Sequence, residues 1–279
     1  MQLSLKLGVL MLVGWLLCTS NSQANAPRVI TIGGDVTAIA SALGASQWLI
    51  ARDTTNTYPP HIRQLPDIGY MRQLNAEGIL ALKPTLILAS EQASPSIVLK
   101  QLSESGVQVI TIPEQPTIAT IFKKIDVIAQ ALNRPLQAKQ LRQQLQQQLD
   151  KIDTTPIKVN TLFIMGHSGM QAMVAGSDTA ADAIITLAGL TNAMQQIKHY
   201  QPISQEGIIA SQADLIITSQ DTINSLGGEQ KIWQLPGIAF TPAGQQHRLL
   251  VIDDLALLGF QLNIAHVIQQ LRDEAQKIR

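Results

Sequence analysis

The 279-residue chain contains a single cysteine, Cys18. Cys18 falls in an N-terminal segment that we expect to be removed, so the mature chain would carry no thiol. A chain without thiols forms neither disulfides nor thiolate metal sites, and it has no cysteine nucleophile. Disulfide-stapled secreted domains and cysteine enzymes are therefore excluded.

Aromatic residues make up 4% of the chain, and 20 basic residues are matched by 20 acidic ones. A sugar-binding cleft uses aromatic stacking platforms, so the composition argues against a carbohydrate ligand. The balanced charge argues against bulk nucleic-acid binding. A zinc or manganese site needs clustered histidine and carboxylate ligands, and the sequence pattern suggests no such cluster.

Long apolar runs are confined to the N-terminus, where residues 7–17 follow Lys6. The run has the length of a signal-peptide core and is short for a membrane span. Leu17 is bulky where a lipobox has a small residue, which disfavours a lipid on Cys18. Small-x-small patterns near Ala24 predict a signal peptide over residues 1–24. We therefore expect an exported, soluble mature protein.

The rest of the chain alternates short β-branched runs with helical stretches, as in "RVITIGG" followed by "DVTAIASALG". This alternation indicates an α/β fold with a mostly parallel sheet. Residues 117–152 break the rhythm with two helical segments, and Pro135 suits the first turn of the second. Its apolar stripe would fit an ordinary surface helix, but the α/β pattern resumes afterwards, which favours a strut between two halves.

The two halves are related by an internal repeat. Residues 75–90, "NAEGILALKPTLILAS", align without gaps with residues 204–219, "SQEGIIASQADLIITS". Each block opens with a helix-capping residue followed by a first-turn glutamate, Glu77 or Glu206, where a carboxylate suits the helix dipole. Capping explains each glutamate singly but not the recurrence of the whole block. We predict an N-terminal lobe over residues 27–133, a linking helix over 134–153 and a C-terminal lobe over 154–279, with a ligand cleft between lobes.

The N-terminal lobe offers a candidate ligand loop in "LPDIGYMRQLN", residues 65–75. Tyr70 and Arg72 lie two apart, so on an extended backbone their side chains would point the same way. A guanidinium beside a phenol stabilises the phenolate, and tyrosinate is a known protein ligand of haem iron. A tyrosine packed on a surface loop would give the same pattern.

The C-terminal lobe offers His167 in "MGHSGM". Flanking glycines would let a large flat ligand approach the imidazole closely, although an isolated histidine is often structural, as we expect for His266. The segment nearly matches the G-x-S-x-G turn of hydrolases, but Met170 replaces the final glycine, which disfavours an esterase acting through Ser168. Met71 adjoins Tyr70 and Met170 flanks His167 three residues on, and thioethers suit the wall of a pocket. They could equally fill the core.

Taken together, the signal peptide, the two lobes on a helical strut and the repeated "EGI" block resemble the periplasmic binding proteins of vitamin B12, siderophore and haem ABC importers. The resemblance covers essentially the whole mature chain. "DIGYMRQLNAEGILALKP" with "MGHSGM" is most similar to the hemin-binding (HmuT-type) group of Gram-negative haem importers. It implies a class III architecture, two Rossmann-like lobes joined by a long helix.

The resemblance also implies a set of roles. Tyr70 would bind the iron of ferric haem b, Arg72 would support the phenolate or meet a propionate, and His167 would be a second iron ligand from the other lobe. Met71 and Met170 would line the haem pocket. The protein would be a periplasmic carrier and not an enzyme.

Glu77 and Glu206 match the lobe-tip glutamates that dock onto the permease in this family. The implied partners are haem, an ABC permease dimer with its ATPase, and an outer-membrane haem receptor system upstream. Cobalamin or a ferric siderophore in the same fold remains the alternative ligand. The sequence leaves open whether the cleft holds one haem or a stacked pair.

Overall fold

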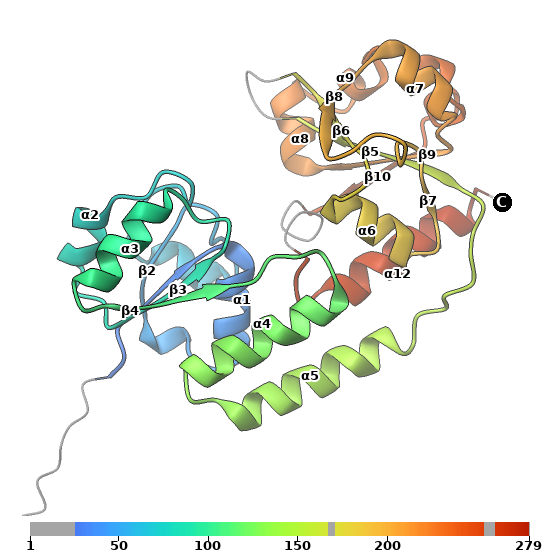
Figure 1. Ribbon diagram of the computed structural model, residues 1–279. Helices are drawn as coiled ribbons and strands as arrows, with labels where there is room; N and C mark the ends of the chain where they lie inside the picture. Colours follow the sequence, from blue (N-terminus) through green and yellow to red (C-terminus); the bar gives the residue numbers. More distant parts are fainter. Residues whose placement is uncertain (1–25, 167–170, 254–259, 279) are drawn as a thin grey trace, which may run out of the picture.

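The computed structural model describes residues 26–166, 171–253 and 260–278 (Figure 1). The signal segment with Cys18, and His167, Ser168 and Met170, lie outside these ranges. Within them, no helix is both long enough and apolar enough to span a bilayer.

The N-terminal lobe is built on a parallel four-stranded sheet in the order β2-β1-β3-β4. Its two inner strands are buried at every position, as expected when helices cover both faces. The strands are β1 (Val29–Ile32), β2 (Leu49–Arg52), β3 (Leu86–Ser90) and β4 (Gln108–Ile112). The helices are α1 (Gly34–Ala42), η1 (Ser46–Trp48), η2 (Pro60–Gln64), α2 (Ala76–Ala81) and α3 (Ser96–Glu104).

The C-terminal lobe carries a mixed sheet in the order β10-β9-β5-β6-β8, with β7 beside β5. Strand β9 pairs in parallel with β10 and with β5, and β5 pairs in parallel with β7. Strand β6 pairs antiparallel with both β5 and β8. The strands are β5 (Asn160–Met165), β6 (Met173–Ala175), β7 (Thr191–Asn192), β8 (Tyr200–Pro202), β9 (Leu215–Ser219) and β10 (Leu249–Ile252). The helices are α6 (Ala180–Leu187), α7 (Gln205–Ser211), α8 (Gln220–Leu226), α9 (Gln230–Trp233), η3 (Ile238–Phe240), α10 (Pro242–Gln245) and α12 (Ile264–Gln276).

Two long helices, α4 (Ile118–Ala131) and α5 (Pro135–Leu149), run side by side between the lobes (Figure 1). The Thr117 side chain caps α4, and Pro135 occupies the first turn of α5 as predicted. In the predicted stripe of α5, Leu145 is buried and its apolar neighbours are partly buried. The helix is therefore a packed strut rather than an isolated surface helix.

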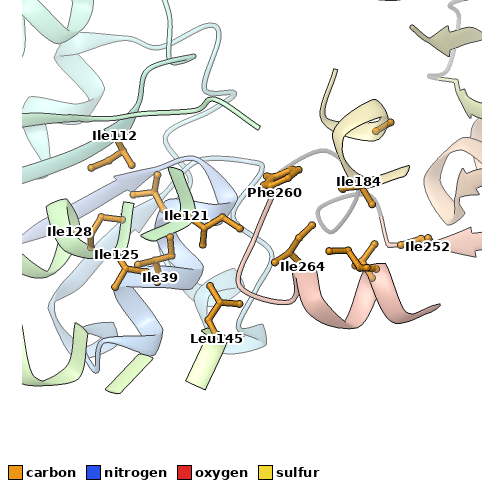
Figure 2. Close-up of a cluster of buried hydrophobic side chains, with 14 of the residues drawn as sticks. Ile39, Ile112, Ile121, Ile125, Ile128, Leu145, Ile184, Ile252, Phe260 and Ile264 are labelled. Atoms are coloured by element: carbon orange, nitrogen blue, oxygen red, sulfur yellow. The ribbon is translucent and has the colours of Figure 1, made fainter. Parts of the chain in front are cut away.

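One hydrophobic cluster extends through both lobes. It passes from Ile39 and Ile121 in the N-terminal lobe, through Leu145 of the strut, to Ile264 of α12 and Ile184 of α6 (Figure 2). Because packed interiors resist changes of shape, this shared core couples the two sheets and limits how far the lobes can move apart.

The repeat seen in the sequence is a structural repeat. Helix α2 with strand β3 corresponds to α7 with β9, so each block forms the same helix–strand unit in its own lobe. The capping prediction is confirmed. The Asn75 side chain accepts a hydrogen bond from the N–H of Gly78 (3.0 Å), and the Ser204 hydroxyl accepts one from the N–H of Gly207 (3.2 Å).

Candidate functional site

Tyr70 lies at the carboxyl end of the N-terminal sheet. The segment before it runs beside the end of β2. There the N–H of Ile68 donates to the carbonyl of Arg52 (2.9 Å), and the N–H of Thr54 donates to the carbonyl of Gly69 (3.0 Å). An ion pair of Arg52 with Asp67 (3.0 Å) fixes the same register. The strand order reverses between β1 and β3, and ligands of open α/β sheets bind at such carboxyl-end crevices.

The backbone at Tyr70 is a turn, so the predicted extended geometry is wrong. Gly69 has a φ of 91°, and the N–H of Gln73 donates to the carbonyl of Tyr70 (2.7 Å). Alternation of side chains holds only for a strand, so the spacing of Tyr70 and Arg72 does not by itself put them on one face. The guanidinium of Arg72 instead donates to the side-chain oxygen of Gln92 (2.9 Å).

The loop after β3 supports the Tyr70 turn. The N–H of Ser94 donates to the carbonyl of Met71 (2.9 Å), and its own carbonyl accepts from Leu74 (3.1 Å). Met71 is partly buried and packs against the hydrophobic cluster of the N-terminal lobe. Its position therefore favours the alternative that this methionine fills the core.

The three tyrosines of the chain lie in different surroundings. Burial raises the pKa of Tyr200 to about 12, so a phenolate forms less readily there than on a tyrosine open to solvent. Tyr70 is 42% exposed and Tyr58 is 61% exposed. Tyr58 is not among the ligand residues predicted from the sequence. The sequence feature that could have pointed to Tyr58 is its place directly before Pro59 and Pro60, because two prolines make the segment rigid and can hold the aromatic side chain outward.

In the C-terminal lobe, the structure describes the residues up to Gly166, directly before the predicted ligand His167. Gly166 follows β5 directly, and its N–H donates to the hydroxyl of Thr222 (3.1 Å). His167 and Met170 come next in the chain, outside the described residues. The connection between β5 and β6 thus starts at the carboxyl end of a parallel strand, the edge equivalent to that of Tyr70. Across the described ranges, no group of three or more histidine, aspartate and glutamate residues is placed to hold a metal ion.

A buried ion cluster lies at the carboxyl end of the N-terminal sheet, where Asp35 comes shortly after β1 and Glu114 comes shortly after β4. The Lys124 ammonium, 1% exposed, is 2.5 Å from a carboxylate oxygen of Asp35 and 2.5 Å from one of Glu114. Burial, followed by the nearby charge of Asp35, raises the pKa of Glu114 to about 7. The N–H of Glu114 also donates to the Glu91 carboxylate (2.9 Å). The cluster therefore braces the loop that holds the Tyr70 turn.

Glu77 and Glu206 occupy equivalent places in the two lobes. Each lies in the first turn of its helix and is exposed, and neither is engaged in an ion pair with another described residue. Since Asn75 and Ser204 already cap the helices, the two carboxylates remain accessible at the surface.

Comparison with known proteins places these features in context. A sequence profile of the family described as periplasmic binding protein matches residues 29–256. The periplasmic haem-binding protein HutB of Vibrio cholerae is 37% identical with a TM-score of 0.80, and the match covers 89% of this chain and 98% of that one. BhuT, a periplasmic haem-binding protein solved in complex with two hemes, is 36% identical with a TM-score of 0.85, over 90% of this chain and 98% of that one. The vitamin B12-binding protein of Pectobacterium carotovorum is 30% identical over 229 residues, which cover 80% of this chain and 81% of that protein.

Proposed function

The chain belongs to the periplasmic binding protein family, and from that premise we propose that it binds haem in the periplasm and delivers it to an inner-membrane ABC importer. The observation that carries the ligand assignment is Tyr70, a half-exposed phenol on a braced turn at the carboxyl end of the N-terminal sheet. Likeness to haem-binding proteins at 36–37% identity supports it. The proposed role is binding and delivery, without catalysis.

The proposed ligand is ferric haem b, and the chemistry at Tyr70 suits it. A phenolate is anionic and offsets ferric charge, whereas a neutral imidazole does not. We propose Tyr70 as the principal iron ligand and His167, from the opposite lobe, as the second. Loss of Tyr70 should therefore weaken haem binding more than loss of His167.

Titration of the purified protein with ferric haem tests the assignment. Wild type should give a strong Soret band with a tyrosinate charge-transfer feature. Tyr70→Phe should lose that feature and bind at least about tenfold more weakly, because the anionic oxygen ligand of the iron is removed and a loss of about 1.4 kcal/mol already gives a tenfold change. Tyr200→Phe is the matched control, because Tyr200 is partly buried, packs against the hydrophobic core and meets the ring of Phe163 edge to face. If the feature disappears in Tyr58→Phe and persists in Tyr70→Phe, the assignment of the ligand is wrong.

Cobalamin is the second candidate, favoured by the 30% identity to the vitamin B12-binding protein. Competition decides between them. A tenfold excess of cyanocobalamin should leave the haem titration of the purified protein unchanged under our proposal. If cobalamin is the true ligand, the same excess should abolish haem binding in that titration.

For delivery, we propose that a signal peptide over residues 1–24 exports the chain and that Glu77 and Glu206 contact basic patches on a two-subunit permease. Two equivalent carboxylates on two related lobes match the symmetry of such a partner. The lobe boundaries predicted from the sequence, residues 27–133 and 154–279, are proposed as the two docking units. Charge pairs of this kind set encounter rate and orientation, so salt should slow delivery.

A further inference from the structure

Each lobe carries an exposed apolar side chain close to its docking glutamate. Ile97 is 55% exposed and Phe240 is 62% exposed. A single exposed apolar residue is ordinary on a protein surface, so its place in the fold decides whether it has a role. Ile97 belongs to α3, which packs against the helix of Glu77, and Phe240 belongs to η3, which packs against the helix of Glu206.

In the N-terminal lobe, the start of α3 is held against the start of α2. The N–H of Leu74, just before α2, donates to the carbonyl of Ser94, just before α3 (3.1 Å). The two helices lie side by side in Figure 1 and pack against each other. Glu77 and Ile97 therefore occupy the first turns of two adjacent helices whose amino ends are tied together.

In the C-terminal lobe, the segment that carries Phe240 packs against α7. Gly237 precedes η3 with a φ of 83°, and a Cβ at this position would lie 2.7 Å from the carbonyl oxygen of Gln205 and 3.0 Å from the side chain of Ile208. The backbone of Gly237 thus lies directly against the first turn of α7, which holds Glu206. Because glycine permits this close approach at a positive φ, η3 is fixed beside that turn.

Both lobes therefore combine one accessible carboxylate with one exposed apolar side chain. Neither Glu77 nor Glu206 is engaged in an ion pair with another described residue. Protein interfaces combine an apolar centre with a polar rim, and a few large side chains carry most of their binding energy. A combination that recurs on two related lobes fits a partner with two equivalent contact patches.

We propose that Ile97 and Phe240 are docking residues for the permease, each entering an apolar depression beside the basic patch that receives the glutamate of the same lobe. The inference rests on the proposed delivery function and adds to its two charge pairs a contact that salt does not screen. The charges steer and orient the approach, and the apolar contacts hold the docked complex while haem is transferred.

Binding of the haem-loaded protein to the haem permease–ATPase complex of the source cells, reconstituted in lipid nanodiscs, tests the proposal. Ile97→Ser and Phe240→Ser keep the net charge, and each should weaken docking about tenfold. This factor equals about 1.4 kcal/mol, close to the low end of the value for burying such a side chain. The factor should be similar at low and high salt, since screening acts on charges. Both variants should bind haem as wild type does, which also shows that they are folded.

Leu136→Ser is the matched control. Leu136 is 73% exposed and, like Ile97, is the second residue of its helix, but it lies on the strut. It should dock as wild type does. The proposal is overturned if Ile97→Ser and Phe240→Ser dock like wild type while combined Glu77→Ala and Glu206→Ala docks poorly. If the glutamate variant docks normally, the proposed docking face is itself wrong, and the inference that rests on it falls as well.

A second copy of the chain is the other candidate occupant of these surfaces. Sedimentation of wild type without the permease should give a monomer. A dimer that Ile97→Ser or Phe240→Ser dissociates would assign the two side chains to a contact between copies and overturn the proposal.

Discussion

Replacing Glu114 by glutamine should change how the stability of the protein depends on pH. The carboxyl of Glu114 shares one buried ammonium, that of Lys124, with the carboxyl of Asp35. Two buried carboxylates against one cation leave an excess negative charge, which burial makes costly. Protonation of Glu114 relieves this excess, so its pKa rises from 4.5 to about 7.

The sign of the effect follows from proton binding. Between about pH 4.5 and 7, the folded protein holds a proton on Glu114 that the unfolded chain has released. The free energy of unfolding therefore falls as pH rises through that window. The contribution is fully present below pH 4.5 and lost above pH 7. At about 1.4 kcal/mol for each tenfold change in proton affinity, the total is at most about 3 kcal/mol.

Urea unfolding at several pH values measures this contribution. Tryptophan fluorescence reports on both lobes, through Trp48 in one and Trp233 in the other. Glu114→Gln should match wild type near pH 5 and exceed its free energy of unfolding by up to about 3 kcal/mol at pH 8. Glu104→Gln, which alters only an exposed pair with Lys100, should keep the wild-type pH profile. Parallel profiles for wild type and Glu114→Gln would refute the reasoning.

Three other outcomes follow from the site and its supports. Combined Glu77→Ala and Glu206→Ala should leave haem affinity nearly unchanged and sharply reduce uptake into transporter vesicles; normal uptake with a lowered melting temperature would show that the glutamates act only as helix caps. Arg72→Ala should weaken haem binding several-fold and retain the charge-transfer band, because the lost hydrogen bond to Gln92 braces the turn and is worth about 1 kcal/mol; an unchanged titration would contradict this. Arg272→Met should lower the free energy of unfolding by about 2–3 kcal/mol in urea, since it leaves two backbone carbonyls without their donor, and a loss below about 0.5 kcal/mol would contradict it.

Much of the fold was accessible from the sequence because it rests on local patterns. Alternating β-branched and helical stretches predicted the α/β architecture, and the recurrence of residues 75–90 at 204–219 predicted two related lobes, each with the same helix–strand unit. Caps at Asn75 and Ser204 could be predicted since a capping side chain bonds to the backbone only three residues away.

The site was predicted only in part. The sequence pointed to Tyr70 as a loop residue, and the structure places it at the carboxyl end of the sheet. The extended geometry assumed for Arg72 failed because the segment turns after Gly69 under hydrogen bonds from distant loops. Short-range spacing says nothing of such contacts, so the direction of a loop side chain cannot be obtained from it.

The alternation of elements and the caps follow from residues a few positions apart along the chain, and the repeat is read by comparing two such local patterns, so all three could be predicted without the structure. Only the tertiary structure brought Asp35 and Glu114 to Lys124, and Arg272 to the carbonyl of Thr155. These residues come from elements separated by tens to hundreds of positions, and each looks like an ordinary polar residue in its own segment. Their partners are set by how sheets and helices pack, which is a property of the whole chain.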